Sequence, residues 1–288
     1  MDAQKGQQRR LWLVHNEASG SNDREALERM DSSCVSCGLH VAYRSSFPTE
    51  DLPTPAMLDE AEIDLVAVFA GDGTVNAALD ALSGWSGQVL VLPGGTMNLL
   101  YHRLFADMTL DEVLELAAGR KLAVRRPGII SSSLGNAYAG LLAGPGTSWN
   151  DVREAMRNTD VLAMATETRE AFARTLRDKP LRCIEPELGR ARGYPLLLLE
   201  PHDKEIVLYA YHAETTAEFV DQLLALAKHD FRQGPHDLIG SSESVTLASV
   251  GGERFGVLLD GEPAEADGPL EFKLVTSEVD LLAKPGND

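Results

Sequence analysis

The sequence predicts a protein of two parts, an α/β domain built on a parallel sheet and then a mainly antiparallel β-sandwich. In roughly the first 120 residues, short apolar runs alternate with helical stretches, which is typical of a parallel sheet covered on both faces. Beyond that point the apolar runs follow one another through turns, which is typical of a sandwich. With 288 residues, 44% hydrophobic and 24% charged, the chain suits one large domain or two moderate ones.

The first domain is expected to contain strands that alternate with helices. The strands are short runs, mostly rich in Val, Ile and Leu, at residues 11–15, 39–43, 63–70 and 88–92. The helices are expected at residues 23–30, 55–61, 75–82 and 110–118. Parallel α/β sheets bind ligands beyond the carboxyl ends of their strands, so the loops after these strands are where a site is expected.

After the helix at residues 110–118, the pattern changes to mostly sequential strands. They are predicted at residues 121–126, 128–133, 136–143, 194–199, 205–211, 244–249, 254–259 and 270–275. Helical interruptions are predicted at residues 147–157, 167–177 and 216–228. The change of pattern places a domain boundary at Arg126–Pro127. Residues 1–126 then form the α/β domain, which residues 277–288 can complete, and residues 127–276 form the sandwich.

The charge and the cysteine content argue against several functions. With 26 basic and 44 acidic residues, the net charge is −18, which disfavours nucleic acid as a partner because phosphate backbones require a basic surface. No apolar run approaches the roughly 20 residues that cross a bilayer. The polar N-terminus carries no signal-peptide core, and three cysteines form no disulfide framework. A cytoplasmic location is therefore expected, with Cys34 and Cys37 as inert residues.

Three of the predicted strands end in loops of small residues. These loops are Asn16-Glu17-Ala18-Ser19-Gly20, Gly71-Asp72-Gly73-Thr74 and Pro93-Gly94-Gly95-Thr96-Met97-Asn98. Glycine lets the backbone approach a ligand closely, and the start of a helix offers unpaired N–H groups to phosphate. Because all three loops are expected at one edge of the sheet, they indicate phosphate binding.

Asp72 has two interpretations within its loop. A carboxylate facing phosphates is unfavourable unless it holds Mg²⁺ or accepts a proton, which gives Asp72 a functional role. Alternatively, residues 71–74 form a tight turn in which Asp72 only caps the following helix. Thr74 can cap that helix or hydrogen-bond to a phosphate oxygen. The loop taken by itself leaves the two interpretations about equal.

Other phosphate-binding and hydrolase patterns fail in detail. A dinucleotide-binding GxGxxG would need glycine at Asn76, and the chain contains no GxxxxGK[ST]. Residues 84–87 resemble the nucleophile turn of serine hydrolases, but the second glycine is misplaced because Gln88 stands at its position.

Together with Leu259-Asp260-Gly261-Glu262 near the C-terminus, the three loops resemble the ordered motifs of the diacylglycerol kinase catalytic-domain family, which includes the sphingosine and ceramide kinases. The resemblance spans nearly the whole chain. It implies an α/β nucleotide domain and a β-sandwich domain, with ATP and a lipid hydroxyl held in a cleft between them. It also implies that the γ-phosphoryl group of ATP is transferred to a lipid alcohol with Mg²⁺.

The resemblance assigns roles residue by residue. The nucleotide-binding positions are Asn16, Ser19, Gly20, Gly71, Gly73, Thr74, Gly95, Thr96, Asn98 and Glu262. Asp72 and Asp260 fall on the catalytic and metal-binding acidic positions, where one aspartate accepts the proton of the acceptor hydroxyl while the other acids organise Mg²⁺ and nucleotide. Without the resemblance, Asp260-Gly261-Glu262 reads more simply as a hairpin turn between two strands.

The acceptor is less closely specified by the motifs. Asp151 lies near the family's substrate region and can bind an acceptor hydroxyl or amine, or it can simply stabilise the start of a helix. Glu17 replaces the proline that usually follows the first asparagine. Leu99 replaces an acid that often follows the third motif in diacylglycerol kinases, and sphingoid-type members also lack that acid. Both diacylglycerol and a sphingoid or ceramide-like alcohol remain candidate acceptors.

The leading hypothesis is an ATP-dependent lipid kinase that uses ATP and Mg²⁺ on a lipid alcohol. One alternative is an inactive nucleotide- or lipid-binding regulatory protein on the same scaffold, and another is a soluble-substrate kinase related to NAD kinases. Because a negatively charged protein is repelled by anionic bilayers, membrane contact is expected to be peripheral and transient. A homodimer is compatible with the sequence.

Overall fold

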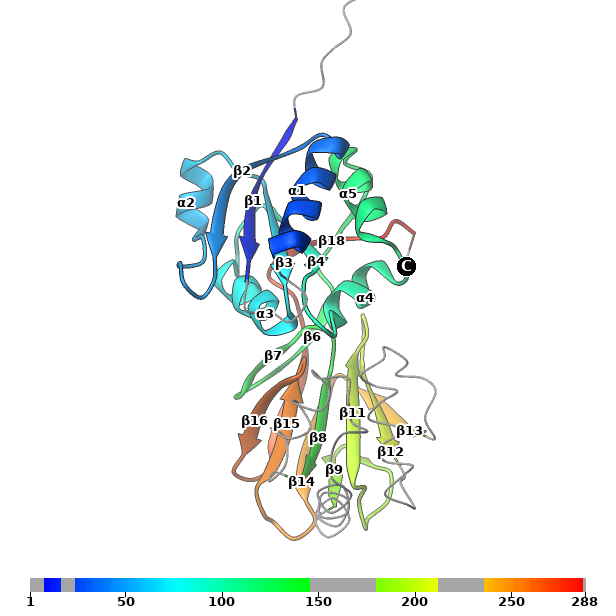
Figure 1. Ribbon diagram of the computed structural model, residues 1–288. Helices are drawn as coiled ribbons and strands as arrows, with labels where there is room; N and C mark the ends of the chain where they lie inside the picture. Colours follow the sequence, from blue (N-terminus) through cyan, green and yellow to red (C-terminus); the bar gives the residue numbers. More distant parts are fainter. Residues whose placement is uncertain (1–7, 17–23, 146–179, 212–235, 287–288) are drawn as a thin grey trace, which may run out of the picture. The chain divides into compact units, whose positions relative to one another are not determined.

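The computed structural model describes residues 8–16, 24–145, 180–211 and 236–286 (Figure 1). The chain divides into two compact units, the first formed by Met1–Arg126 with Ser277–Asp288 and the second by Pro127–Thr276. Each unit contains its own sheet or sheets.

The first unit is built on a six-stranded sheet with the order β2-β1-β3-β4-β18-β5. Its strands are β1 (Arg9–His15), β2 (Leu39–Ser46), β3 (Leu65–Ala70), β4 (Gln88–Pro93), β5 (Ala123–Arg125) and β18 (Asp280–Ala283). Neighbouring strands are parallel except β18 and β5, which are antiparallel. The C-terminal segment thus enters this sheet between β4 and β5.

Helices pack against this sheet and against one another. They are α1 (Arg24–Cys37), α2 (Pro55–Glu60), α3 (Asp72–Ala81), α4 (Leu99–Phe105) and α5 (Leu110–Ala118). Helices α1 and α5 contact each other, α3 contacts β3, and α4 contacts β4 and β18 (Figure 1). Every residue of β3 is buried, as expected for a central parallel strand that is covered on both faces.

The second unit contains two six-stranded antiparallel sheets, with the orders β10-β9-β14-β17-β6-β7 and β13-β12-β11-β8-β15-β16. Their strands are β6 (Gly128–Ser132), β7 (Gly135–Ala137), β8 (Leu141–Pro145), β9 (Leu181–Glu185), β10 (Glu187–Leu188), β11 (Leu196–Pro201), β12 (Ile206–Tyr211), β13 (His236–Ser242), β14 (Ser244–Ser249), β15 (Phe255–Leu259), β16 (Glu262–Ala266) and β17 (Leu270–Thr276). Phe272 of one sheet and Phe255 of the other belong to one buried core. Two sheets that share a core in this way form a β-sandwich.

The predicted fold class, a parallel α/β part followed by an antiparallel β part, is confirmed. Several elements differ from the prediction. Helix α3 begins at Asp72 rather than at residue 75, and the predicted strand 136–143 is two strands separated by Tyr138–Gly140. The helices predicted at residues 147–157, 167–177 and 216–228 lie outside the described residues.

Some elements of the structure have no counterpart in the prediction. They are β9, β10, β13, β16 and β18, whereas α4 is the helix expected after the third loop, for which the sequence gives no bounds. Helix α4 has only seven residues, which is too short to show a helical period. Strands β13 and β16 are the two edges of their sheet, and edge strands commonly carry polar residues and proline instead of alternating apolar ones. Within the described part of the chain, none of the helices has the length and apolarity required to cross a bilayer.

Candidate functional site

Three loops meet at one edge of the sheet in the first unit. Strands β1, β3 and β4 are adjacent and parallel, with His15 paired to Phe69 and Ala70 paired to Pro93 at their carboxyl ends. The chain leaves these three strands at Asn16, Gly71 and Gly94, so the loops that the sequence selects begin side by side. This is the edge at which open α/β sheets bind their ligands.

A side-chain hydrogen bond joins the first loop to the second. Asn16 is half-buried, and its Nδ2 donates to Thr74 Oγ1 across 2.9 Å. Thr74 is buried at 7% exposure and makes no capping bond to α3, which has Gly71 as its N-cap without a side-chain cap hydrogen bond. Thr74 therefore links two loops. Ser19 and Gly20, the other predicted residues of the first loop, lie outside the described residues.

The second and third loops touch backbone to backbone. A Cβ atom placed on Gly95 would lie 2.5 Å from the Cα of Gly71, and one placed on Gly94 would lie 2.5 Å from the backbone nitrogen of Ala70. Atoms cannot approach this closely, so the two positions require glycine for space rather than for an unusual φ. The glycines thus bring the two loops into direct contact, while Thr96 of the third loop is half-buried.

Asp72 spans the second and third loops. It is the first residue of α3, and its Oδ1 accepts the backbone N–H of Leu99, the first residue of α4, at 2.7 Å. A carboxylate at the start of a helix interacts favourably with the helix dipole and with N–H groups that lack helical partners. The two sequence interpretations of Asp72, a functional carboxylate and a cap of α3, do not include this contact. Asp72 does not cap α3, and its partner is the backbone N–H of Leu99 rather than a side chain.

Asp260 belongs to the second unit and is held by backbone donors. Its Oδ2 accepts the N–H of Tyr138 at 2.6 Å, and its Oδ1 accepts those of Ala139 and Gly140 at 2.8 and 2.9 Å. Asp260 is only 3% exposed. The segment that supplies these donors separates β7 from β8, and nothing in its sequence marks it as a partner of Asp260.

Asp260 also forms a hairpin turn. Asp260 and Gly261 connect β15 to β16, with φ values of 47° and 87°. Two positive φ angles are what a two-residue hairpin loop requires, and Asp-Gly is one of its preferred sequences. Glu262 is the first residue of β16, pairs with Leu259, and is half-buried. Asp260 and Gly261 therefore do form the hairpin turn that their sequence suggests. The turn does not by itself require the Asp260 carboxylate to be buried, so the backbone donors around that carboxylate are a separate feature.

Two further predictions concern the acceptor and the metal. Asp151, the predicted acceptor-binding residue, lies outside the described residues. Within the described ranges, no group of three or more His, Cys, Asp or Glu side chains is arranged to hold a metal ion.

Cys34 is buried at 1% exposure, and this burial raises the pKa of its thiol to about 12. A thiol in that state is unreactive at neutral pH, in line with the expectation from the sequence.

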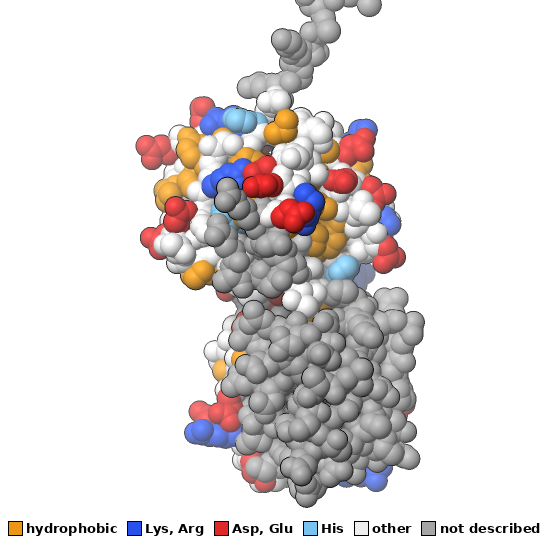
Figure 2. Space-filling model, in the orientation of Figure 1, with side chains coloured by type: hydrophobic (Ala, Val, Ile, Leu, Met, Phe, Trp, Pro, Cys, Tyr) orange, Lys and Arg blue, Asp and Glu red, His pale blue; other side chains and the backbone are white. Residues whose placement is uncertain are grey.

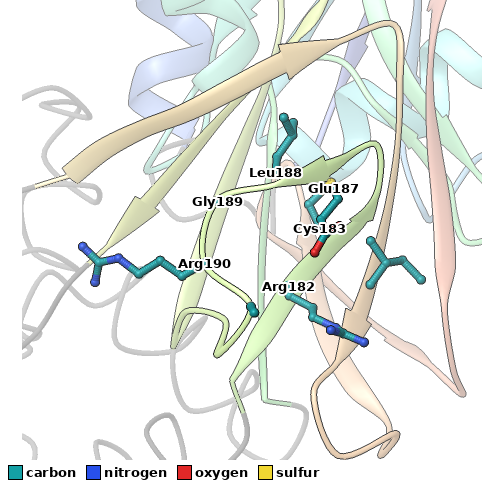
Figure 3. Close-up of a pocket in the computed structure, with 8 residues that line it drawn as sticks. Arg182, Cys183, Glu187, Leu188, Gly189 and Arg190 are labelled. Atoms are coloured by element: carbon teal, nitrogen blue, oxygen red, sulfur yellow. The ribbon is translucent and has the colours of Figure 1, made fainter.

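A separate hollow of about 210 Å³ lies beside β9 and β10 (Figure 3). It is lined by residues 182–184 and 187–191, none of which the sequence selects. Arg182 and Arg190 point in opposite directions (Figure 3). Arg190 lies 3.6 Å from Asp237 in an ion pair and 5.7 Å from the ring centroid of Tyr194. Because the two guanidinium groups diverge, this hollow lacks the converging charges of an anion site.

Comparisons with known proteins bear on both units. Residues 10–125 match the family model described as the diacylglycerol kinase catalytic domain. No curated protein matches the sequence. Three solved structures from Bacillus anthracis str. Sterne share the fold across nearly the whole chain. Two are named provisionally as diacylglycerol kinases. One has a TM-score of 0.61 at 13% identity, covering 98% of this chain and 99% of its own. The other has a TM-score of 0.59 at 15% identity, covering 96% and 98%.

The third structure, named as a diacylglycerol kinase, has a TM-score of 0.58 at 13% identity and covers 96% of this chain and 97% of its own. Likeness at this level of identity concerns the fold, which the two units share with these proteins. The match to the family model bears on the site as well as on the fold, because residues 10–125 include all three loops of the first unit. Residues 10–125 are therefore similar to the diacylglycerol kinase catalytic domain, which is the resemblance that the ordered motifs predict.

Proposed function

We propose that the protein is an ATP-dependent lipid kinase, which transfers the γ-phosphoryl group of ATP to the hydroxyl of diacylglycerol or of a sphingoid or ceramide-like lipid. The observation that supports this most directly is the joining of three loops at the carboxyl edge of the sheet. Contacts between Asn16 and Thr74, between Asp72 and Leu99, and between Gly95 and Gly71 combine them into one frame. Phosphoryl transfer depends mainly on such positioning.

The frame fits a triphosphate. At Gly71 and Gly95 the main chains meet without side chains between them, so backbone N–H groups at the start of the ten-residue helix α3 can approach phosphate oxygens. We assign nucleotide binding to Asn16, Ser19, Gly20, Gly71, Gly73, Thr74, Gly95, Thr96, Asn98 and Glu262. Asp151 is proposed to contact the acceptor hydroxyl.

Asp72 and Asp260 are the proposed catalytic and metal-binding residues. Their carboxylates supply the oxygen atoms that Mg²⁺ prefers. When bound, Mg²⁺ neutralises charge that develops on the phosphates during transfer. One aspartate accepts the proton of the acceptor hydroxyl, for which a carboxylate within hydrogen-bond reach is sufficient. The backbone donors around each carboxylate fix its orientation before substrate binds.

The proposal is tested with labelled ATP, Mg²⁺ and a panel of lipid alcohols, with products identified by mass. A single phosphorylated lipid is expected. The Asp72→Asn variant should lose about 10²- to 10⁴-fold in turnover and remain folded, since an amide oxygen can still accept the N–H of Leu99. Asp107→Asn is the matched control, because Asp107 is exposed in the same unit.

Other outcomes would point elsewhere. Undiminished turnover in Asp72→Asn would reject the proposed mechanism. ATP binding without transfer to any lipid would favour an inactive regulatory protein, and phosphorylation of NAD would favour a soluble-substrate kinase.

We also propose a cytoplasmic protein that contacts membranes peripherally and transiently. Acidic and basic side chains are interspersed on the visible face of the first unit (Figure 2), and the chain as a whole carries a net charge of −18. Anionic bilayers repel such a surface, and salt screens the repulsion. Flotation with vesicles should therefore show weak binding that improves on neutral lipids. Tight binding to neutral and anionic vesicles alike, insensitive to salt, would show that apolar insertion dominates.

A further inference from the structure

Asn98 has an unusual backbone conformation at the end of the third loop. Its φ and ψ are 51° and 44°, in the left-handed region, at the N-cap of α4. L-residues other than glycine rarely adopt this region, and asparagine is among the few that do so readily. The position therefore favours glycine, asparagine or aspartate on conformational grounds, before any contact with a ligand is considered.

The side chain of Asn98 turns back on its own loop. Its Oδ1 accepts the backbone N–H of Gly95 at 2.8 Å, and its Nδ2 donates to the carbonyl oxygen of Gly95 at 2.9 Å. One amide thus engages both polar groups of a single residue three positions earlier. This pair of hydrogen bonds fixes how Gly95 is oriented within the loop.

The orientation of Gly95 matters because Gly95 is the contact point with the second loop. A Cβ atom there would lie 2.5 Å from the Cα of Gly71 and 3.3 Å from Oδ1 of Asn98 itself. Gly95 is therefore enclosed between Gly71 on one side and the Asn98 amide on the other. Any rotation of the Gly95 peptide would disturb the contact between the two loops.

We infer that Asn98 is also a positioning residue, whose side chain holds Gly95 against Gly71 and so affects a bound nucleoside triphosphate through the backbone of the loop. This inference rests on the proposed function and deepens it. An Asn98 that contacts phosphate directly would use its amide as a hydrogen-bond donor to the ligand. In this structure one amide N–H and the amide oxygen are both directed at Gly95.

Three variants separate the two roles. Asn98→Asp keeps an oxygen that accepts the N–H of Gly95 and tolerates the left-handed conformation. Asn98→Gly keeps the conformation but loses both hydrogen bonds, and Asn98→Ala loses both and is also strained. The control pair is Glu62→Ala and Glu62→Gly, because Glu62 is exposed in the same unit with a φ of 53° and calibrates the effect of a positive φ by itself.

Two measurements are made on each variant. Amide hydrogen exchange of Gly95 is followed in the nucleotide-free protein, where Asn98→Asp should keep protection and both Asn98→Gly and Asn98→Ala should lose it. The affinity for a non-hydrolysable ATP analogue with Mg²⁺ should fall about fivefold in Asn98→Asp and about 25-fold in Asn98→Gly, at about a factor of five for each hydrogen bond. It should fall further in Asn98→Ala, and KM for ATP should rise more than kcat falls.

The outcomes are distinguishable. If Asn98→Asp binds the analogue worst, a new carboxylate is facing the phosphates and the positioning role is overturned. The role is also overturned if exchange of the Gly95 amide is unchanged in Asn98→Gly. If the wild-type protein does not bind the analogue at all, the proposed function fails, and the exchange measurement still reports whether Asn98 holds Gly95.

Discussion

Replacing Asp260 by asparagine should make the second unit easier to unfold, because the carboxylate accepts hydrogen bonds through both oxygens. Oδ2 receives the N–H of Tyr138 at 2.6 Å, while Oδ1 receives those of Ala139 and Gly140. An amide has only one oxygen. The asparagine amide keeps most hydrogen bonds when its oxygen accepts the N–H groups of Ala139 and Gly140. In that orientation its NH₂ group points at the N–H of Tyr138. Two donors then face each other in a buried position.

The cost follows from the contacts. A buried N–H left without an acceptor costs about 1–3 kcal/mol. The two remaining hydrogen bonds change from charge-assisted to neutral, which weakens them by about half and adds about 1 kcal/mol. The sum is about 3 kcal/mol. Both aspartate and asparagine tolerate the positive φ of 47° at this turn, so backbone strain adds nothing to the difference.

Urea unfolding measured by circular dichroism, with hydrogen exchange of residues 255–266 as a local probe, tests this magnitude. At a typical slope, a loss of about 3 kcal/mol lowers the midpoint by about 1–2 M urea. Asp267→Asn is the control, since Asp267 is exposed and makes only a surface ion pair with Arg254 at 2.9 Å. A midpoint for Asp260→Asn equal to that of the control would refute the reasoning.

Other predictions follow from single contacts in the first unit. Gly95→Ala should weaken nucleotide binding by separating two loops, because its Cβ would lie 2.5 Å from the Cα of Gly71; calorimetric titration with ATP checks this, and unchanged affinity would contradict it. Arg9→Ala should cost about 2–3 kcal/mol of unfolding free energy, since the buried guanidinium donates hydrogen bonds to the Ala117 carbonyl oxygen and to Gln88 Oε1; chemical unfolding checks this, and an unchanged midpoint would contradict it. Backbone and side-chain hydrogen bonds from Thr109 hold the pKa of Glu112 below 4.5. Glu112 therefore stabilises the fold above the ordinary carboxyl pKa, and this contribution is lost as the pH falls through the lowered pKa, so the destabilisation by Glu112→Gln in thermal melts should shrink as the pH is lowered from 7.

The Gly95→Ala prediction needs a control for the general effect of replacing glycine. Gly268 has open space where a Cβ atom would lie and no positive φ. Gly268→Ala should therefore leave both stability and nucleotide affinity unchanged, or raise stability slightly by restricting the unfolded chain.

The sequence predicts the parallel core of the first unit because the physical signal there is strong. Strands β3 and β4 are continuous apolar runs, which a sheet covered on both faces requires. The polar edge strand β16, with sequence Glu-Pro-Ala-Glu-Ala, gives no such signal. The bounds of helix α4 are not predictable for a different reason. The helix starts directly after the left-handed Asn98 and has only seven residues, which are too few to show the hydrophobic period of a helix.

The positions of the loops in the first unit are predictable, while their contacts with one another are not. Adjacent parallel strands place Asn16, Gly71 and Gly94 at the same edge, which follows from strand order. The bond from the N–H of Leu99 to Asp72 depends on how α4 begins, and no side-chain pattern encodes it. The same holds for Asp260, whose partners are backbone groups about 120 residues earlier in the chain.

These contacts decide how substitutions of the two proposed catalytic aspartates are to be interpreted. At Asp72 an amide oxygen can replace the carboxylate oxygen that accepts from Leu99, so Asp72→Asn removes charge while keeping this contact. At Asp260 an amide cannot satisfy the donors on both oxygens. Equal losses of turnover in Asp72→Asn and Asp260→Asn would therefore have unequal meanings. The first would indicate a role for the charge in phosphoryl transfer, whereas the second would indicate one only if hydrogen exchange showed an intact hairpin at residues 255–266.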